Sequence, residues 1–358
     1  MVLVLGAGGG LSLPADEDYE NMRIFVDFQK NVSTGVHVGT VGHGKGYTVY
    51  GLMKGQNNPK TSLIQEEHPY VELVQGDLAD LTSLITAVEQ VQPAEVYNLG
   101  AISFVAYSWE NAFVTSDVTA MGVLNVLEAV RLHAGDDPSA IRFYQASSSE
   151  MFGKVQEVPQ SENTLLWPRS PYGVSKVYGH YMTINYRESY GMHASSGILF
   201  NHESPRRGPE FVTRKISQAV ARIHLGQQDS MALGNLDARR DWGYAGDYVE
   251  AMWRMLQAEE PEDFVIATGE THSVREAVEV AFARQGLDPD EHLEIDPRYY
   301  RPSEVDVLLG DASKARDRLG WEPTVRFKEL VELMVDADVA QLSDQLAGKV
   351  TRYSHEGV

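Results

Sequence analysis

The chain of 358 residues contains no cysteine. Disulfides, thiolate zinc sites, iron–sulfur clusters and a cysteine nucleophile are therefore excluded, and no metal site is expected. Basic residues are also scarce, because 30 Lys and Arg stand against 51 Asp and Glu and give a formal net charge of −21. Such a balance argues against binding nucleic acid, whose phosphates attract clustered cations. An anionic small ligand would need a local basic pocket.

Long apolar runs and internal repeats are missing as well. No apolar run reaches the roughly 18 residues that span a membrane, and residues 1–10 lack the basic start and apolar stretch of a signal peptide. A soluble cytoplasmic protein without membrane association is expected. Hydrophobic residues make up 43% and charged residues 23%, which is close to the globular average. The length predicts one large or two interleaved domains.

Strand-like and helix-like segments alternate along most of the chain. Strands are predicted at 47–53, 71–74, 95–99, 141–146 and 196–200. Between them, apolar residues at helical spacing predict helices at 81–88, 123–130 and 174–184. Repeated strand–helix–strand units predict an α/β fold with a doubly wound, parallel, Rossmann-type sheet.

A second, smaller α/β domain is expected after residue 203, where the strands become short. Residues 1–203, together with 234–259 and the C-terminal helix region, are assigned to the Rossmann domain. Residues 204–233 and 260–327 are assigned to the smaller domain, which would bind the substrate. Helices are expected at 212–223 and 247–256 and from residue 330, and 348–358 is polar enough to form a loose tail.

Tyr172 and Lys176 stand four residues apart on a predicted helix, so both side chains project from one face. A nearby ammonium favours the phenolate and lowers the pKa of a tyrosine from its usual value of about 10, which makes the phenol a usable acid or base. Such pairs also arise by chance on helix surfaces. The pair alone is therefore a weak signal.

Three serines and a carboxylate follow the strand predicted at 141–146, namely Ser147, Ser148, Ser149 and Glu150. The carboxyl ends of strands in doubly wound sheets are where ligands bind. Hydroxyls and a carboxylate there can bind a substrate hydroxyl and remove a proton. The alternative is that the serines cap the following turn, which is the more frequent use of such a cluster. Because the helix of Tyr172 would face the same crevice, we favour an active site.

Six runs of sequence carry a resemblance to a known family. They are FYQASSSEMFG at 143–153, PRSPY at 168–172, GILFNHESPRRG at 197–208, GNLD at 234–237, RDWGY at 240–244 and RPSEVD at 301–306. Through them, residues 46–340 are similar to the GDP-mannose 4,6-dehydratases of the extended short-chain dehydrogenase/reductase superfamily. The resemblance implies NADP as cofactor, GDP-mannose as substrate and a homo-oligomer, either a dimer or a tetramer.

The resemblance also assigns the chemistry. Tyr172 would be the base that starts oxidation at C4 of the mannose, with Lys176 as its partner. Ser148 aligns with the family's usual threonine, and Glu150 would be the acid/base that acts on C5 and C6. The implied product is GDP-4-keto-6-deoxymannose, formed by hydride transfer from C4 to NADP and on to C6 with loss of water.

Further residues are assigned to the ligands. By the resemblance, the cofactor would contact Asp77, Leu78, Leu99, Gly100, Ala101, Ser103, Lys176, His202 and Arg207. Lys54 stands at the tip of the second strand, where NAD enzymes usually place an acidic residue, so it favours the 2′-phosphate of NADP. The nucleotide sugar would contact Ser149, Asn201, Lys215, Arg240, Arg301 and Glu304. For Arg206, Arg239 and Arg298 the favoured interpretation is a solvated charge pair.

The amino end departs from the family, which opens with a strand, a Gly-x-x-Gly-x-x-Gly loop and a helix. The sequence predicts a strand at 2–5, a phosphate loop with Gly6 and Gly9, and a helix at 15–29. The glycines at 39–46 leave no room for a helix before the strand at 47. In the family the first glycine lies roughly 17 residues before the position of Gly46, but Gly6 lies 40 before it. Residues 1–45 thus match neither sequence nor length, and a disrupted reading frame upstream of Gly46 is one hypothesis.

Two other functions stay open. One is a different nucleotide-sugar epimerase or dehydratase, although Glu150 argues against an epimerase, which needs no base at C5. The other is an inactive nucleotide-binding homologue whose cofactor loop is disrupted. Phe104 stands where many relatives have histidine and Val114 replaces a tyrosine, which indicates a subgroup because neither residue carries protons in the reaction.

Overall fold

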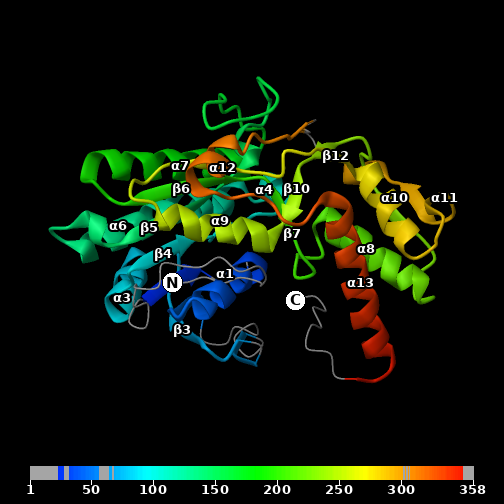
Figure 1. Cartoon of the computed structure of the whole chain (residues 1–358), viewed down its shortest axis with the longest axis horizontal. Coiled ribbons are helices and arrows are strands. Elements are labelled where there is room, and N and C mark those ends of the chain that lie inside the picture. Colours follow the sequence, from blue (N-terminus) through cyan, green and yellow to red (C-terminus); the bar gives the residue numbers. More distant parts are fainter. Residues whose placement is uncertain are drawn as a thin grey trace.

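A seven-stranded parallel sheet forms the larger part of the protein, in a computed structural model that describes residues 23–27, 32–55, 64–66, 68–300, 303, 305 and 307–349 (Figure 1). The strand order is β11-β6-β5-β4-β1-β2-β3. The strands are β1 Arg23–Asp27, β2 Thr48–Met53, β3 Val71–Gln75, β4 Glu95–Asn98, β5 Arg142–Ser148, β6 Ala194–Leu199 and β11 Phe264–Ile266. The predicted doubly wound fold is confirmed. The order reverses between β1 and β4, and sheets of this kind bind ligands beyond the carboxyl ends of such strands.

Helices cover both faces of the sheet (Figure 1). One face carries α3 Leu81–Val91, α6 Gly122–Ala134 and α7 Pro171–Tyr190, together with the shorter α4 Val105–Glu110, α5 Ala112–Ser116 and the π-helix η2 Asp117–Met121. The other carries α1 Val32–Gly44, α9 Ala245–Gln257 and α12 Ser313–Leu319. Apolar residues at helical spacing, such as Leu84 and Val88 of α3, turn into the core that these layers enclose.

The amino-terminal elements differ from the prediction. Residues 23–27 form the strand β1, which pairs with both β2 and β4, so the helix predicted at 15–29 was wrong. The glycines at 39, 42 and 44 lie inside α1, so the expected lack of room for a helix was wrong too. The strand predicted at 2–5 and the loop of Gly6 and Gly9 lie outside the described residues, as does the tail beyond 349.

A smaller unit lies beside the sheet, at the right of Figure 1, and has its own apolar core. Its helices are α8 Val212–His224, α10 Val274–Arg284, α11 Pro289–His292 and α13 Phe327–Leu346. Its strands pair two by two: β7 Asn201–Glu203 with β10 Trp242–Tyr244, β9 Arg239–Arg240 with β12 His272–Ser273, and β8 Met231–Leu233 with β13 Leu293–Ile295. The short helices η3 Pro138–Ala140, η4 Ser149–Met151 and η5 Pro297–Tyr299 complete the elements.

The predicted domain boundaries need three corrections. The strands β7, β9 and β10 belong to the smaller unit, although residues 201–203 and 239–244 fall in the ranges assigned to the Rossmann domain. The strand β11 and the residues Ala315 and Trp321 belong to the core of the large sheet, although they fall in the range assigned to the smaller domain. Conversely, α13 was expected to return to the sheet, but its apolar residues Leu330 and Met334 pack in the core of the smaller unit, against α8 and α10. The chain therefore crosses between the two units more often than the sequence indicated.

Among the described residues, one helical run is long and apolar enough, by length and composition, to cross a membrane: Ala112–Ala134. In its most apolar window of 18 residues, 56% is buried inside the protein. A buried core helix passes the same test, so the run is weak evidence for a membrane span.

Candidate active site

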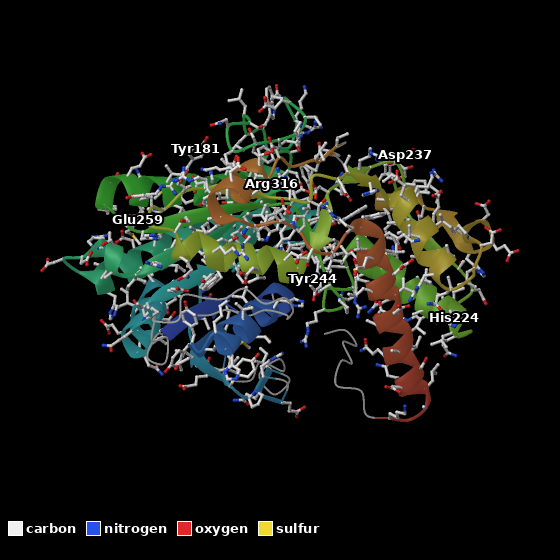
Figure 2. The ribbon with its side chains drawn as sticks, viewed as in Figure 1. Tyr181, His224, Asp237, Tyr244, Glu259 and Arg316 are labelled. Carbon is white, nitrogen blue, oxygen red and sulfur yellow. The ribbon has the colours of Figure 1, made fainter. Side chains whose placement is uncertain are left out.

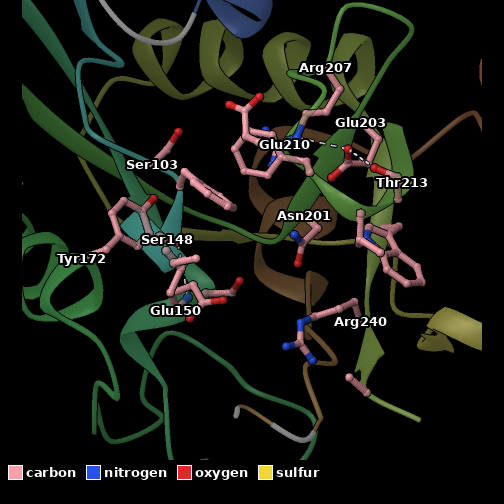
Figure 3. Close-up of a pocket in the computed structure, with 18 of the residues that line it drawn as sticks. Ser103, Ser148, Glu150, Tyr172, Asn201, Glu203, Arg207, Glu210, Thr213 and Arg240 are labelled. Atoms are coloured by element: carbon pink, nitrogen blue, oxygen red, sulfur yellow. Dashed lines mark hydrogen bonds and ion pairs between the residues drawn. The ribbon is translucent and has the colours of Figure 1, made fainter. Parts of the chain in front are cut away.

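A cavity of about 540 Å³ lies between the carboxyl ends of the sheet strands and the smaller unit. Its walls include residues that follow β4, β5 and β6, residues of α7, and residues of α8 and β9 from the other side. The volume is in the range of small-molecule and cofactor sites. In Figure 3, Tyr172, Ser148 and Glu150 group on one side of the cavity and Arg240 lies across from them, with Asn201 between.

The end of β5 supplies the hydroxyls and the carboxylate that the sequence singled out. Ser148 is the last residue of the strand, and its Oγ accepts a hydrogen bond from the backbone N–H of Glu150 at 3.3 Å. This bond caps the short helix η4, and Ser148, Ser149 and Glu150 all line the cavity. Ser148 therefore both caps η4 and lines the cavity, although capping and a place in the site were considered as alternatives.

The helix α7 places Tyr172 and Lys176 at the same cavity wall. The hydroxyl of Ser170 caps its amino end by accepting from the N–H of Gly173 at 3.0 Å, and Pro171 occupies the first helical position, where a missing N–H costs nothing. Tyr172 thus falls in the first turn, beside Ser148. Lys176 Nζ donates to the carbonyl oxygen of Ala146 at 2.7 Å and lies 5.8 Å from the centroid of the Tyr172 ring.

The electrostatics of this pair differ from the prediction. Burial raises the pKa of Tyr172 to about 12, with an opposing effect from its hydrogen bond to Ser148. Burial also lowers the pKa of Lys176 to about 7. Within the described protein, the ammonium therefore does not bring the pKa of the phenol down, as the spacing had suggested. The protein's own groups leave Tyr172 protonated at neutral pH, and a further positive charge is needed to make it a base.

The predicted cofactor residues fall into two groups. Leu99, Ser103, Lys176, His202 and Arg207 line the cavity, whereas Lys54, Asp77, Leu78, Gly100 and Ala101 do not. The second group lies at the carboxyl ends of β2, β3 and β4, along the same edge of the sheet. Lys54 forms an ion pair with Asp77 there. Both groups thus lie where a dinucleotide extended along the strand ends would reach them.

His202 of β7 lines the cavity. Its ring stacks on Tyr248 with centroids 5.2 Å apart, and Nδ1 lies 2.9 Å from the carbonyl oxygen of Phe200, which accepts a hydrogen bond. Burial lowers the pKa of His202 to about 4, and the positive charge of Arg207 adds to the effect. At neutral pH the ring is therefore uncharged.

The predicted substrate residues that the structure describes also line the cavity: Ser149, Asn201, Lys215 and Arg240. Arg240 Nη1 donates to the carbonyl oxygen of Val305 at 2.7 Å, and Lys215 Nζ lies 3.7 Å from the centroid of the Tyr299 ring. Arg301 and Glu304 lie outside the described residues. Lys215 and Arg240 give this half of the cavity the local positive charge that an anionic ligand needs in an acidic protein.

The three arginines predicted to form solvated charge pairs, Arg206, Arg239 and Arg298, differ in their surroundings. Arg239 lies 3.3 Å from Glu276, and Arg298 pairs with Asp296 at 2.6 Å, both at the surface as predicted. Arg206 is part-buried, and its Nη1 lies 3.4 Å from Nε2 of His68.

Sequence reasoning missed several residues of the cavity wall. Glu203, Phe211 and Thr213 lie between the predicted residues Asn201 and Lys215, so their position in the chain was the available signal. Tyr299 and Tyr300 precede the predicted Arg301 in the same way. Phe104, noted only as a departure from the relatives, also lines the cavity and meets Phe211 edge-on, with ring centroids 6.1 Å apart.

Counting back from Gly46 gives the place in this sequence where the resemblance puts the phosphate loop. Counting roughly 17 residues back from Gly46 leads to Gln29, just after β1, and the motif spacing of three then leads to Val32 and Gly35. Only the third of these positions is a glycine. The length of this region therefore agrees with the family, contrary to the prediction, and the departure lies in the first two glycines. Residues 28–31 themselves lie outside the described part of the chain.

Comparison with known proteins agrees with this geometry. The family model described as GDP-mannose 4,6 dehydratase matches residues 34–334. The chain belongs to the GDP-mannose 4,6-dehydratase family. It is 53% identical to GDP-mannose 4,6 dehydratase 1 of Arabidopsis thaliana over 305 residues, which cover 82% of this chain and 84% of that protein. It is 50% identical to the human GDP-mannose 4,6 dehydratase over 322 residues, which cover 82% of this chain and 86% of that protein.

Solved structures show how this dehydratase-family chain folds. The UDP-glucose 4-epimerase of Thermus thermophilus, solved with NAD, superposes with a TM-score of 0.74 at 25% identity and covers 88% of this chain and 99% of its own. The dTDP-glucose 4,6-dehydratase of Bacillus anthracis, solved with NAD, superposes with a TM-score of 0.75 at 20% identity. It covers 90% of this chain and 98% of its own. The fold is therefore shared with epimerases as well as dehydratases, and the choice between them depends on the residues of the site.

Proposed function

We propose that the protein is a GDP-mannose 4,6-dehydratase that converts GDP-mannose to GDP-4-keto-6-deoxymannose and water in the cytoplasm. The observation that carries the proposal is the convergence of Tyr172, Ser148 and Glu150 on one wall of the cavity, with Lys215 and Arg240 elsewhere in the cavity wall. An epimerase has no use for a carboxylate at the position of Glu150. Membership of the family, at 45–53% identity to its curated relatives, supports the same reaction.

In the first half of the reaction, Tyr172, which is hydrogen-bonded to Ser148, removes the proton from the C4 hydroxyl. Ser103, Lys176 and His202 would hold an oxidised nicotinamide, which would supply an acceptor for the hydride of C4, a donor of it to C6, and a positive charge that would lower the pKa of Tyr172. Lys176, held on the Ala146 carbonyl, lies close enough to favour the phenolate when it is protonated. The C4 ketone then acidifies the hydrogen at C5.

In the second half, Glu150 acts first as a base and then as an acid. Its carboxylate removes the C5 proton, and the same proton goes to the C6 hydroxyl, which leaves as water. When hydride returns to C6, C5 regains a proton. The proton that Tyr172 took from the C4 hydroxyl accounts for it. No reducing equivalent is consumed overall, so the cofactor is regenerated at each turnover.

For the cofactor we propose NADP. Lys54 and Asp77 form an ion pair at the ends of β2 and β3, where the adenosine ribose of a dinucleotide lies in such sheets. A lysine at this point suits a 2′-phosphate, which can attract Nζ away from Asp77. The described residues fit the nicotinamide half too, since Ser103, Lys176 and His202 line the cavity beside Tyr172.

A second candidate function rests on the link between β1 and α1. By count from Gly46, Gln29 and Val32 stand in the sequence where the family has its first two glycines, the residue type that lets a backbone approach a pyrophosphate closely. The protein would then be a nucleotide-binding homologue with poor cofactor retention. The two candidates differ in whether added NADP restores turnover.

One experiment tests both candidates: incubation with GDP-mannose, UDP-glucose or dTDP-glucose, with and without added NADP or NAD. We expect 4-keto product only from GDP-mannose, and only when NADP is added. The double variant Gln29→Gly, Val32→Gly restores the motif spacing with Gly35 and should retain NADP through purification. Turnover of UDP-glucose instead would contradict the proposed substrate, and no turnover even in the double variant would favour the inactive homologue.

We also propose that the protein forms a dimer through α5 and α7, which pack side by side. Phe113 of α5 is 88% exposed, and Val174, Tyr178 and Tyr181 of α7 form an exposed stripe at helical spacing. Figure 2 shows Tyr181 on the outer face of the protein. A patch of large apolar side chains of this kind on a chain of net charge −21 fits a second copy of the same patch.

The double variant Phe113→Glu, Tyr181→Glu should be monomeric, because four carboxylates would face one another in the dimer. Sedimentation velocity measures the change. Leu346→Glu, at an exposed residue of α13, is the matched control and should keep the parental mass. A monomeric parent at micromolar concentration would contradict the proposal.

A further inference from the structure

A buried carboxylate lies in the cavity wall without a part in the proposed chemistry. Glu203 ends β7, whose pairing with β10 fixes its backbone, and only 1% of the residue is exposed. Its Oε2 accepts a hydrogen bond from the hydroxyl of Thr213 at 2.6 Å and lies 3.1 Å from Nε of Arg207. Figure 3 draws both contacts as dashed lines. Burying a charge of this kind costs free energy unless an opposite charge pairs with it.

The partner, Arg207, is held on two sides. The carboxylate of Glu203 forms an ion pair with its Nε, without the geometry of a hydrogen bond, and the guanidinium lies over the ring of Phe211, with the central carbon 3.5 Å from the ring centroid. Phe211 in turn meets Phe104, which follows β4 on the sheet side of the cavity. Arg207 therefore lies at the junction of the two units, and its position depends on both.

The ends of the guanidinium remain available to a ligand. Within the part of the chain that the structure describes, no protein acceptor bonds to the terminal nitrogens of Arg207, and the residue lines the cavity. A guanidinium fixed through Nε can offer both terminal nitrogens to one anion, whereas a freely rotating side chain must be ordered on binding.

We propose that Glu203 is a positioning residue that aims Arg207 at the dinucleotide. The inference rests on the proposed function, which assigns Arg207 to the cofactor. It adds Glu203, which does not touch the ligand and acts by orienting the side chain of Arg207. Thr213 fixes the carboxylate from the first turn of α8, so the smaller unit contributes to the aim as well.

The test is titration of the protein with NADPH, followed by fluorescence, in four forms: the parent, Glu203→Gln, Arg207→Gln and the double variant. Glutamine keeps the size of Glu203 and can still accept from Thr213, but it loses the charge. We expect the Kd for NADPH to rise by about 10-fold in Glu203→Gln, because the substitution removes one charge of a buried ion pair. The Kd for GDP should stay within about 2-fold. In the double variant the Kd should equal that of Arg207→Gln alone, because Glu203 acts only through Arg207.

Asp338→Asn is the matched control. Asp338 is equally buried, accepts from the hydroxyl of Ser217 at 2.6 Å and pairs with Arg214, but these residues do not line the cavity. Thermal denaturation should show a similar loss of stability in Asp338→Asn and Glu203→Gln, with the Kd for NADPH raised only in the latter. A further loss of affinity in the double variant, or a parental Kd in Arg207→Gln, would overturn the inference. Normal NADPH binding without turnover of GDP-mannose would instead contradict the proposed function and leave Glu203 in its role.

Discussion

Tyr172→Phe is expected to lose oxidation at C4 while it keeps its affinity for GDP-mannose. The substitution removes one oxygen atom at the cavity wall, and the aromatic ring, which is 7% exposed, stays in place. Because Tyr172 is the group proposed to take the C4 proton, the rate should fall by at least about 10²-fold, the lower bound for loss of a general base. The measurement is the absorbance of the reduced nicotinamide in a single turnover with NADP added in excess.

The pH dependence of the parent gives a second readout for Tyr172. Burial raises its pKa to about 12 in the protein alone, and a bound nicotinamide would lower that pKa; in both cases more of the phenol is ionised as the pH rises, so the rate of the first oxidation should rise with pH. Tyr172→Phe should lose this rise as well as the rate. Hydride transfer at the parental rate in Tyr172→Phe would mean that another group is the base.

Glu150→Gln is expected to separate the two halves of the reaction. Glutamine has nearly the same shape but cannot take the proton from C5 or give it to the C6 hydroxyl. Elimination of water should fall by roughly 10²–10⁴-fold, the usual worth of general acid–base catalysis, while reduction of the nicotinamide in the first turnover survives. The variant should therefore accumulate the oxidised, still hydroxylated sugar, which mass spectrometry distinguishes from the product because it carries one more oxygen atom.

Exchange with solvent provides the control for Glu150. In heavy water the parent should incorporate deuterium at C5, whereas Glu150→Gln should return substrate without it. Deuterium at C5 at the parental rate in Glu150→Gln would assign the C5 proton to a different residue.

The sheet was predictable where local patterns were strong. Apolar residues at helical spacing on α3, α6 and α7, and buried strands between them, left little choice of fold. The position of the site could also be predicted from the order of strands and helices, because the end of β5 and the first turn of α7 meet at one edge of a parallel sheet. What the sequence could not show was the ionisation of the pair there, since burial of Tyr172 and Lys176 outweighs the effect of the spacing.

The failures lie where tertiary contacts outweigh local preference. The glycines of α1 resembled a loop that leaves no room for a helix before the strand at 47, and glycine also weakens a helix by about 1 kcal/mol per residue. Yet α1 is held by contacts with β1, β2 and α9, and next to its end Lys45 lies 3.6 Å from the centroid of the Trp253 ring. The last helix, α13, was assigned to the wrong unit because its apolar stripe fits either core, and only the three-dimensional path of the chain decides.

The position of β1 has a consequence for how the protein can be shortened. Similarity to the family begins at residue 34, after this strand has ended, so a boundary drawn from the alignment would discard residues 23–27. Those five residues bond to β2 on one side and β4 on the other. Without them the sheet falls into a two-strand and a four-strand piece, each with a bare edge that invites pairing with another chain. The part of the sequence least like its relatives is thus the part that joins the two halves of the sheet, and its backbone is needed whatever its side chains are.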